Sequence, residues 1–450
     1  MLVLAGCAGN DPRERSSAGG DAGARAGDDA AADPRGDVGT DESSDRASDA
    51  DGDVAGFDRD GDADAGSSSR ATRLYVWAGD RDRRQSDFLA VLDVTQDGEE
   101  YGRVIATTPV DARATMPHHT EHELHPSRTL FANGFVAGRT FVFDLSEPDA
   151  PRATASLAEA DGWTFPHSYV RLPSGNVLVT FQGRGPDNVD PGGLVELAPD
   201  GSVVRSASAA DPSARGELIR PYSLAILPEL DRVVSTSYDM GEDMGFRGGR
   251  RGRTRVVQVW RLSDLSVIRT IVLPPSAGGR NEQPGEPRVL PDGRTVLVST
   301  FTCGLWRITG LEGEEPAAGL VHSFDGGGCA LPVVQGRFWV QSVPSAHAVV
   351  ALDVSDPSRP REVSRIELGG RSFPHWLALD PGSGRIVVTD RGDGERRVRM
   401  VRLDDQTGAL SVEEPFRDPG SDRPGVSFER REWPHGAAGA ATPHGAVFGP

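Results

Sequence analysis

Lysine is absent from this 450-residue chain, and its 48 basic side chains, all arginine, are outnumbered by 67 acidic ones, which gives a net charge of −19. A protein that binds nucleic acid neutralises phosphates with a basic stripe or patch. No such stripe is present, so we expect no nucleic-acid partner. The chain also lacks any apolar run of the roughly 18 residues that a membrane-spanning helix needs. The folded body is therefore expected to be soluble.

Two common catalytic signatures are missing as well. No Gly-x-Ser-x-Gly motif marks a nucleophile elbow, and no glycine-rich phosphate loop is found. No long helix is predicted either, although a nucleophile elbow requires a strand-to-helix turn. These absences exclude the usual serine hydrolases and P-loop nucleotide enzymes.

Cysteine is scarce, with three residues, and the first stands in a distinctive place. Residues 2–6 form a short apolar run that ends in small residues immediately before Cys7. This pattern is similar to the lipobox at which a bacterial lipoprotein signal is cleaved and its cysteine lipidated. We expect residues 1–7 to be a signal remnant, Cys7 to carry lipid, and the protein to be an exported lipoprotein of the bacterial cell envelope. An accidental match is the alternative.

Apolar residues are rare in residues 8–71, which consist almost entirely of Asp, Gly, Ala, Ser and Arg. Such a segment cannot bury enough apolar surface to offset the loss of backbone entropy on ordering, about 1–2 kcal/mol per residue. We expect a disordered acidic linker here, followed by one folded domain over residues 72–450.

From residue 72 onward, short runs rich in Val, Leu, Thr and aromatic residues alternate with turn signals such as Pro173-Ser174-Gly175. The runs recur in sets of four, and one set comprises residues 165–170, 176–182, 194–198 and 202–208. Four strands in roughly 45–65 residues is the length of one β-propeller blade. The predicted fold class is therefore all-β.

A proline followed by a residue of variable type opens most of these sets. The pairs are Pro166-His167, Pro221-Tyr222, Pro284-Gly285 and Pro374-His375, together with Pro117-His118-His119, offset by one so that His119 takes the variable position. Openers fall near residues 118, 167, 222, 285, 330, 375 and 435–448, which predicts a propeller of seven blades. Because the first strand of a blade lines the central channel, side chains of this column should converge on the axis.

The two ends of the folded region complement each other. Residues 73–78, 88–95 and 103–110 supply three strands without an opener. The C-terminal end supplies two candidate openers without a blade, at residues 433–435 and 442–444. Joining them predicts a last blade closed by N- and C-terminal strands. The sequence leaves open whether His435 or His444 faces the channel.

Several segments also carry a family resemblance. They are residues 88–94 ahead of the double histidine His118-His119, residues 140–152, and residues 165–169 with the turn that follows them. In these segments the chain resembles the selenium-binding protein family, whose bacterial members include methanethiol oxidases. The resemblance implies a seven-bladed propeller and the oxidation of a small thiol such as methanethiol.

Histidines are frequent at the position directly after the opening proline of each set, which we call the opener column. Six of the chain's ten histidines lie in this column or beside it. The candidate metal ligands are His118, His119, His122, His167, His375, His435 and His444. Strand alternation predicts that His118 and His122 share one face and that His119 takes the other. Imidazole ligands favour copper or zinc over calcium or magnesium, and we expect copper, with zinc as the alternative. The other interpretation is that these side chains bind channel waters and backbone groups.

Four further polar residues are secondary candidates. Tyr222, Glu121 and Glu123 are possible ligands or partners of ligands, and Arg288 is a possible site for an anionic substrate.

The two remaining cysteines stand on neighbouring repeats. Cys303 ends one predicted strand and Cys329 opens the next blade. In an oxidising compartment such a pair most simply forms a disulfide. The alternative is that Cys329 is a thiolate ligand near the axis, because residues 326–329 occupy an opener position.

Two functions follow from these observations. The first is a metal-dependent oxidase of small sulfur compounds, and the second is a non-catalytic binding or scaffold propeller at the cell envelope. A propeller lactonase ranks last, because its calcium site needs axial Glu, Asp and Asn rather than histidine. We expect a monomer with a small-molecule substrate that meets the membrane only through its lipid anchor.

Overall fold

The computed structural model describes residues 71–185, 188–214, 216–217, 219–241, 254–391 and 394–450. The predicted signal remnant with Cys7, and residues 8–70 of the predicted linker, lie outside these ranges. Within them the chain is built from β-strands, and helical structure is confined to three 3-10 turns, η1 (Pro228–Leu230), η2 (Ala277–Gly279) and η3 (Pro344–Ala346). No helix in these ranges is long and apolar enough to cross a membrane.

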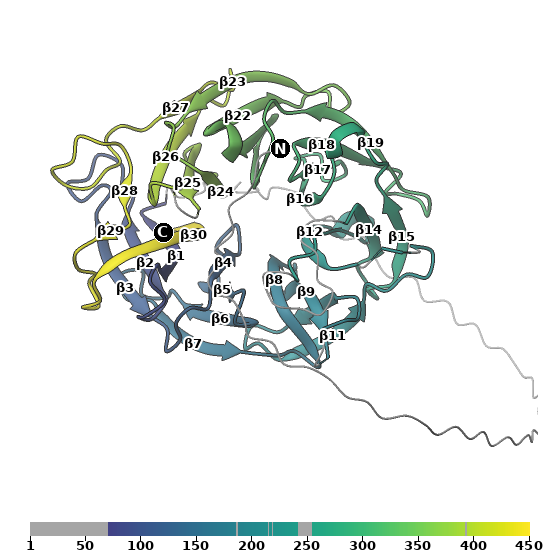
Figure 1. Ribbon diagram of the computed structural model, residues 1–450, viewed down its shortest axis with the longest axis horizontal. Helices are drawn as coiled ribbons and strands as arrows, with labels where there is room; N and C mark the ends of the chain where they lie inside the picture. The colour runs from purple at the N-terminus through teal and green to yellow at the C-terminus, as the bar shows by residue number, and fades with distance from the viewer. Residues whose placement is uncertain (1–70, 186–187, 215, 218, 242–253, 392–393) are drawn as a thin grey trace, which may run out of the picture. The chain divides into compact units, whose positions relative to one another are not determined.

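Seven antiparallel sheets stand around a ring, and each sheet is one blade (Figure 1). Blade 2 contains β4 (Pro117–Thr120), β5 (Thr129–Gly134), β6 (Arg139–Asp144) and β7 (Arg152–Leu157). Blade 3 contains β8 (Trp163–Arg171), β9 (Val177–Arg184), β10 (Gly193–Leu197) and β11 (Val203–Ser208). Blade 4 contains β12 (Pro221–Leu227), β13 (Arg232–Ser237), β14 (Val256–Arg261) and β15 (Val267–Val272).

The next three blades repeat this order, with the first strand innermost. Blade 5 contains β16 (Pro284–Val289), β17 (Val296–Thr300), β18 (Gly304–Thr309) and β19 (Ala317–Ser323). Blade 6 contains β20 (Pro332–Gln335), β21 (Phe338–Val343), β22 (Ala348–Asp353) and β23 (Arg361–Glu367). Blade 7 contains β24 (Pro374–Asp380), β25 (Arg385–Asp390), β26 (Arg397–Leu403) and β27 (Leu410–Val412), and β28 (Val426–Ser427) pairs with β26.

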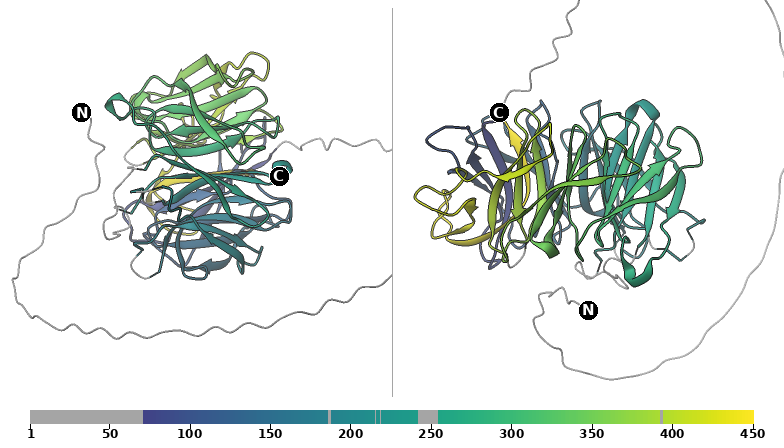
Figure 2. Two further views of the ribbon diagram at one scale, coloured as in Figure 1. Left: turned by 90° about the vertical axis from the view of Figure 1, so that its right-hand side faces the viewer. Right: turned by 90° about the horizontal axis from the view of Figure 1, so that it is seen from above.

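Blade 1 joins strands from both ends of the folded region. It contains β1 (Arg73–Asp80), β2 (Phe88–Asp93), β3 (Val104–Pro109), β29 (Glu429–Arg430) and β30 (Gly439–Gly449). β30 is the inner strand and runs antiparallel to β1, with Val447 opposite Tyr75. In Figure 2 the yellow C-terminal strand lies among the purple N-terminal strands. The predicted seven-bladed all-β propeller, closed by strands from both ends, is confirmed.

The second strands show why this sequence forms a propeller. β13, β21 and β25 are buried along their whole length, because each sheet packs on both faces against its neighbours. Each of these strands has a short apolar run at its centre or start, namely Val233-Val234, Phe338-Trp339-Val340 and Ile386-Val387-Val388, followed by buried polar residues. The outer strands β7 and β11 have no fully buried residue and are mostly polar or small. The apolar clusters therefore lie between adjacent blades.

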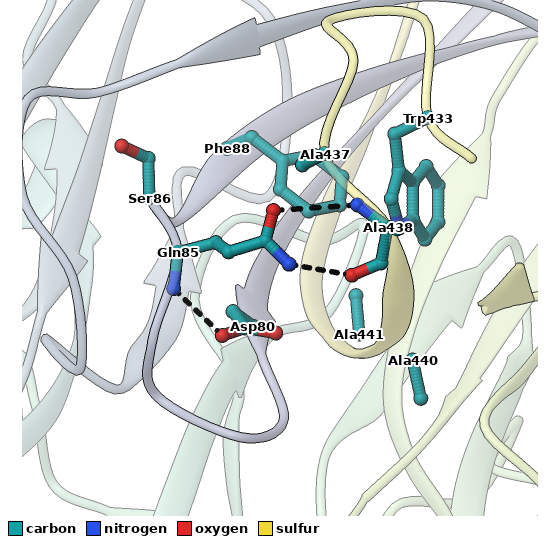
Figure 3. A pocket seen from close by; sticks show the side chains of 9 residues that line it. All are labelled: Asp80, Gln85, Ser86, Phe88, Trp433, Ala437, Ala438, Ala440 and Ala441. Atoms are coloured by element: carbon teal, nitrogen blue, oxygen red, sulfur yellow. Dashed lines mark hydrogen bonds between the residues drawn. The ribbon is translucent and has the colours of Figure 1, made fainter. Parts of the chain in front are cut away.

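A turn ahead of β30 fastens the closing strand to blade 1 (Figure 3). Gln85, in the loop between β1 and β2, donates from Nε2 to the Ala438 carbonyl at 2.6 Å and accepts from the Ala438 amide at 3.3 Å. Trp433 packs on Phe88 with ring centroids 4.7 Å apart. The candidate opener at residues 433–435 forms this turn, so the inner strand is the one that carries His444.

A disulfide joins Cys303 to Cys329, with Cα atoms 5.0 Å apart. Cys303 lies between β17 and β18, and Cys329 precedes β20; both are buried. The bond ties blade 5 to the segment that enters blade 6. It also leaves Cys329 without a thiolate that could bind a metal.

Replacing both cysteines with serine removes a link that spans 26 residues of sequence. The free energy of unfolding should fall by about 3 kcal/mol, because the unfolded chain regains conformational entropy. Urea unfolding of the full chain measures this difference. Dithiothreitol should lower the stability of the wild type to that of the variant without changing the variant. Equal stability of the two oxidised proteins would contradict the prediction.

Candidate metal centre

The inner strands of blades 2 to 7 have a hydrogen-bonded neighbour on their outer side only. In blade 1, β29 pairs with Gly439 and Ala440 at the start of β30, ahead of Pro443. Proline, which lacks an N–H group, is tolerated at such an edge. It stands there at positions 117, 166, 221, 284, 374 and 443. The register of the ladder shifts directly after each of these prolines, which marks a β-bulge. Because a bulge re-aims side chains, the residues after the prolines do not follow ordinary strand alternation.

The bulge of blade 2 holds two histidines. The ladder between β4 and β5 leaves both His118 and His119 opposite the single residue Asn133. Their rings stack with centroids 4.5 Å apart and planes 11° apart. The expectation that His119 faces away from His118 is therefore wrong, because the bulge suspends the period of two. In register, His118 rather than His119 matches His167 of blade 3.

Asn133 ties the bulges of blades 2 and 3 together. Its Oδ1 accepts from the His119 amide at 2.6 Å, and its Nδ2 donates to the carbonyls of Pro166 at 2.9 Å and His167 at 3.2 Å. The Asn133 side chain is fully buried, and hydrogen bonds shielded from water are electrostatically stronger. The backbones that carry the two histidines are thus held in a fixed relation.

Five buried histidines from four blades converge at the axis. They are His118 and His119 on β4, His167 on β8, His375 on β24 and His444 on β30. In two groups of three, one ring nitrogen from each member lies within 4.8 Å of the others. One group is His118, His119 and His167, and the other is His118, His375 and His444. His118 therefore stands at the centre of the cluster.

Gly445 lets the closing strand reach this cluster. A Cβ atom at Gly445 would lie 2.7 Å from the His118 carbonyl oxygen and 2.7 Å from the Thr120 amide nitrogen. Any larger residue would push β30 away from β4. In the Pro443-His444-Gly445 sequence, the proline precedes a bulge, the histidine is a candidate ligand, and the glycine lets the backbone of β30 approach that of β4.

Hydrogen bonds orient two of the rings. His167 Nδ1 donates to the Tyr222 carbonyl at 2.7 Å, which leaves the lone pair of its Nε2 available. His119 Nδ1 is 2.9 Å from the Ser168 hydroxyl. Metal-binding imidazoles typically bond the protein through one nitrogen and the ion through the other. His167 leaves its Nε2 free in this way, whereas Nε2 of His119 lies 3.5 Å from the Tyr222 hydroxyl.

Several buried ring nitrogens of the cluster have no hydrogen-bond partner among the described residues. They are both nitrogens of His118, both nitrogens of His444, and Nε2 of His167 and His375. An unsatisfied buried polar atom costs roughly 1–3 kcal/mol. So many in one place destabilise a cluster that has only a structural role. Each neutral imidazole has one nitrogen with a lone pair, and a metal ion would bind that nitrogen in these four rings. The residues present therefore fit an imidazole-bound metal.

Burial keeps these imidazoles neutral. It lowers the pKa of His167 to about 3 and the pKa values of the other four well below their usual range. The positive charge of Arg391 lowers the pKa of His167 further. Neutral imidazole with a free lone pair is the form that binds metals. The cluster is in that form at neutral pH.

His122 stands beside the cluster but in neither group of three. Its ring stacks on Trp376 with centroids 4.5 Å apart, and its Nε2 accepts from Arg288 Nη2 at 3.0 Å. Trp376 also lies against His119, at 5.0 Å between centroids. Arg288 is paired with Glu286 at 2.8 Å. The charge of Arg288 is therefore already balanced within the protein, which does not favour it as an anion site.

Three other sequence candidates are not brought into the cluster. His435 lies in the turn before β30, where its Nδ1 is 2.7 Å from Thr107 Oγ1. Glu121 is buried in an ion pair with Arg171 at 2.8 Å, and Glu123 is exposed. None of the three belongs to either histidine group.

Four residues around the cluster were not sequence candidates: Asn133, Ser168, Trp376 and Arg391. Ser168 and Trp376 each follow a histidine of the column directly, and Asn133 is an amide within an apolar strand, so a signal for these three was present. Arg391 follows β25 and is marked only by its position in the repeat.

Comparison with known proteins supports the resemblance seen in the motifs. Selenium-binding protein 2 of Arabidopsis thaliana is 28% identical over 182 residues, 37% of this chain and 36% of that protein. Methanethiol oxidase of Hyphomicrobium sp. is 24% identical over 218 residues, 45% of this chain and 48% of that protein. The aligned part spans between a third and a half of these curated relatives. No protein-family model matches the chain.

Solved structures share the fold. A hypothetical selenium-binding protein from Sulfolobus tokodaii superimposes with a TM-score of 0.66 and 16% identity, over 84% of this chain and 94% of that one. A periplasmic gluconolactonase from Pseudomonas aeruginosa gives a TM-score of 0.56 at 16% identity, over 84% and 98%. At these identities the likeness concerns the fold alone. The similarity to selenium-binding proteins that the sequence indicated is nevertheless confirmed.

The neutral cluster predicts an acid-sensitive fold. In the unfolded chain these histidines regain a pKa near 6.5, so below that pH the unfolded state binds more protons and the free energy of unfolding falls. Each shifted histidine adds about 1.4 kcal/mol per pH unit to this slope. Urea unfolding between pH 7 and 5, with a chelator present, measures it.

Two variants test whether the pH dependence of the free energy of unfolding comes from the histidine cluster. The double variant His118→Asn/His444→Asn should unfold with a shallower pH dependence, because two buried imidazoles are gone. His125→Asn, which alters a surface-loop histidine, should leave the slope nearly unchanged. The same slope in all three proteins would contradict the assignment to the cluster.

Proposed function

We propose that this chain is an exported, copper-dependent oxidase of small thiols such as methanethiol, with zinc as the alternative metal. The observation that supports this most strongly is the convergence of buried imidazole nitrogens without hydrogen-bond partners among the described residues. Similarity to a protein named methanethiol oxidase is the second support. The fold itself does not discriminate, because propellers carry many unrelated functions.

The histidines would hold the ion through the nitrogens that lack protein partners. These belong to His118, His167, His375 and His444, and His119 completes one of the two groups. Copper would supply one-electron exchange between a thiolate and dioxygen, whereas zinc would supply only Lewis-acid chemistry.

Tyr222 keeps a proton beside the cluster. Its hydroxyl is 3.5 Å from His119 Nε2, and its ring lies 3.9 Å from the His167 ring. Burial raises the pKa of Tyr222 well above its usual value. The hydroxyl therefore stays protonated at neutral pH and is available as a hydrogen-bond donor to His119 or to a molecule at the site.

Aromatic rings exclude water from the histidines. Phe135 is fully buried at 5.3 Å from His118 and 5.2 Å from His167, and Trp376 is fully buried against His119. Electrostatic interactions strengthen where water is excluded, so a charged group at this site interacts strongly with its surroundings.

Metal analysis tests the proposal first. Full-length protein purified from medium with copper should contain near-stoichiometric copper, and His118→Gln/His444→Gln should lose it. His435→Gln is the matched control, because it removes a histidine outside the cluster and should retain the metal. Copper(II) electron paramagnetic resonance should show nitrogen ligands in the wild type and control.

Turnover then tests the activity. Oxygen uptake with methanethiol should follow copper content across the three proteins. Copper in the cluster without any thiol oxidation would contradict the proposed reaction. Well-folded protein without any metal would contradict the centre itself and favour a non-catalytic binding propeller at the cell envelope.

The proposed export makes its own prediction. Expression from the natural gene region should attach lipid to Cys7, which the wild type would show by incorporating labelled palmitate and fractionating with membranes. Cys7→Ala should lose both properties, while Cys303→Ser/Cys329→Ser should keep them. Wild-type protein that incorporates no labelled palmitate and stays in the soluble fraction would contradict the proposed lipid anchor.

A further inference from the structure

One position of the repeat places a side chain next to the histidine cluster in several blades. It is the residue directly after the second strand, and its amide donates to the carbonyl of the residue before the opener proline. These bonds run from Phe135 to Met116 at 3.0 Å, Tyr238 to Arg220 at 3.2 Å, Phe301 to Gln283 at 2.9 Å and Arg391 to Phe373 at 3.0 Å. The four residues are therefore equivalent, each beside a bulge that faces the axis.

Three of the equivalent residues form an aromatic wall, namely Phe135, Tyr238 and Phe301. Tyr238 and Phe301 contact each other at 4.3 Å between centroids, and Phe301 lies 5.2 Å from Tyr222. Phe135 contacts two histidines of the cluster. Tyr238 and Phe301 are only partly buried. The wall therefore offers apolar surface beside the candidate metal centre.

The fourth residue is the cation Arg391. Its guanidinium has no hydrogen bond or ion pair anywhere in the described part of the chain, although it is partly buried. By contrast, the buried arginines Arg220, Arg385 and Arg399 are each paired with an aspartate, at 3.1, 2.9 and 2.6 Å. Arg391 thus differs from these buried arginines in having no acidic partner among the residues that the structure describes.

The backbone places Arg391 beside the bulge that carries a histidine of the cluster. Its amide bonds the carbonyl of Phe373, two residues before His375, and the equivalent Phe135 contacts His118 and His167. In keeping with this position, the positive charge of Arg391 adds to burial in lowering the pKa values of four of the cluster histidines. The fixed positive charge of Arg391 would repel a metal ion bound by the histidines. An anion between the guanidinium and the ion would offset this repulsion, because it is attracted to both.

We propose that Arg391 and the aromatic wall bind an organic anion at the histidine cluster, the guanidinium pairing with its charge and the wall with its apolar part. If the proposed function holds, the anion is the thiolate of a small aliphatic thiol, whose proton goes to solvent on binding. Cationic surroundings lower the pKa of a thiol, so the site favours that form near neutral pH. Arg391 is then a residue that selects and positions substrate.

Binding of an unreactive analogue tests this site. Calorimetric titration of the full chain with 1-butanesulfonate should show saturable binding, and the neutral butyl methyl sulfone should bind at least about tenfold more weakly, because a charge-assisted hydrogen bond is lost. Arg391→Gln should reduce sulfonate affinity by about tenfold or more, whereas Arg391→Lys retains part of it. Arg359→Gln, on an exposed loop, is the matched control and should not change it.

The aromatic wall has a separate signature. Phe301→Leu should lower the affinity for 1-butanesulfonate more than the affinity for methanesulfonate, because only the longer alkyl chain reaches the aromatic wall. Sulfonate affinity that is unchanged in Arg391→Gln, in protein whose circular dichroism matches the wild type, would overturn the inference. So would equal affinity for the sulfonate and the sulfone.

Running the titrations with and without metal separates this inference from the proposed function. If sulfonate binding depends on Arg391 in a protein that holds no metal and oxidises no thiol, the anion site is supported and only the proposed oxidase activity is contradicted. If copper-dependent thiol oxidation has the same KM in Arg391→Gln as in the wild type, only the anion site is contradicted. A higher KM with a smaller change in kcat supports both.

Discussion

Where they carry the cluster histidines, the inner strands have a hydrogen-bonded partner on one side only, and the candidate site depends on this constraint. An unpaired edge accepts proline without losing a ladder bond. In every blade except the sixth, a bulge follows this proline and frees the next side chains from strand alternation. In blade 2 this freedom brings two adjacent histidines into contact, as Asn133 fills the place opposite both. A regular strand would have sent one of them into the space between blades.

Burial at the axis gives these side chains their chemical character. A single histidine in water is half protonated near pH 6.5, but the clustered rings are neutral, stacked and short of hydrogen-bond partners. The protein stabilises them only in part, through the Tyr222 carbonyl and the Ser168 hydroxyl. Each of these neutral rings keeps a lone pair that a metal ion can bind, and the nearby Arg391 has no acidic partner among the described residues. A cation with several imidazole ligands and a small anion therefore complement this site together.

The fold was largely predictable because it repeats. Recurring proline pairs and the runs of four strands after them sufficed to predict seven blades and the shared closing blade. The site was less predictable, because alternation fails at bulges, and bulges leave no mark in a single strand's apolar pattern. His119 was therefore assigned to the wrong face. His435 could not be told from His444, because each directly follows a proline near the end of the chain. Arg391 was missed because its role depends on equivalence with Phe135 and Phe301, which only the hydrogen bonds between strands show.

β30 carries His444 and is also the strand that closes the ring. The other four histidines of the cluster precede it in the chain, so a polypeptide still emerging from the ribosome has an incomplete cluster and an open seam at once. Completion of the centre and completion of the fold are therefore the same event in time. An ion that binds His444 together with His118 and His375 would bridge blade 1 to blades 2 and 7, on both sides of that seam. It would then act as a clasp, since opening the ring would require its release.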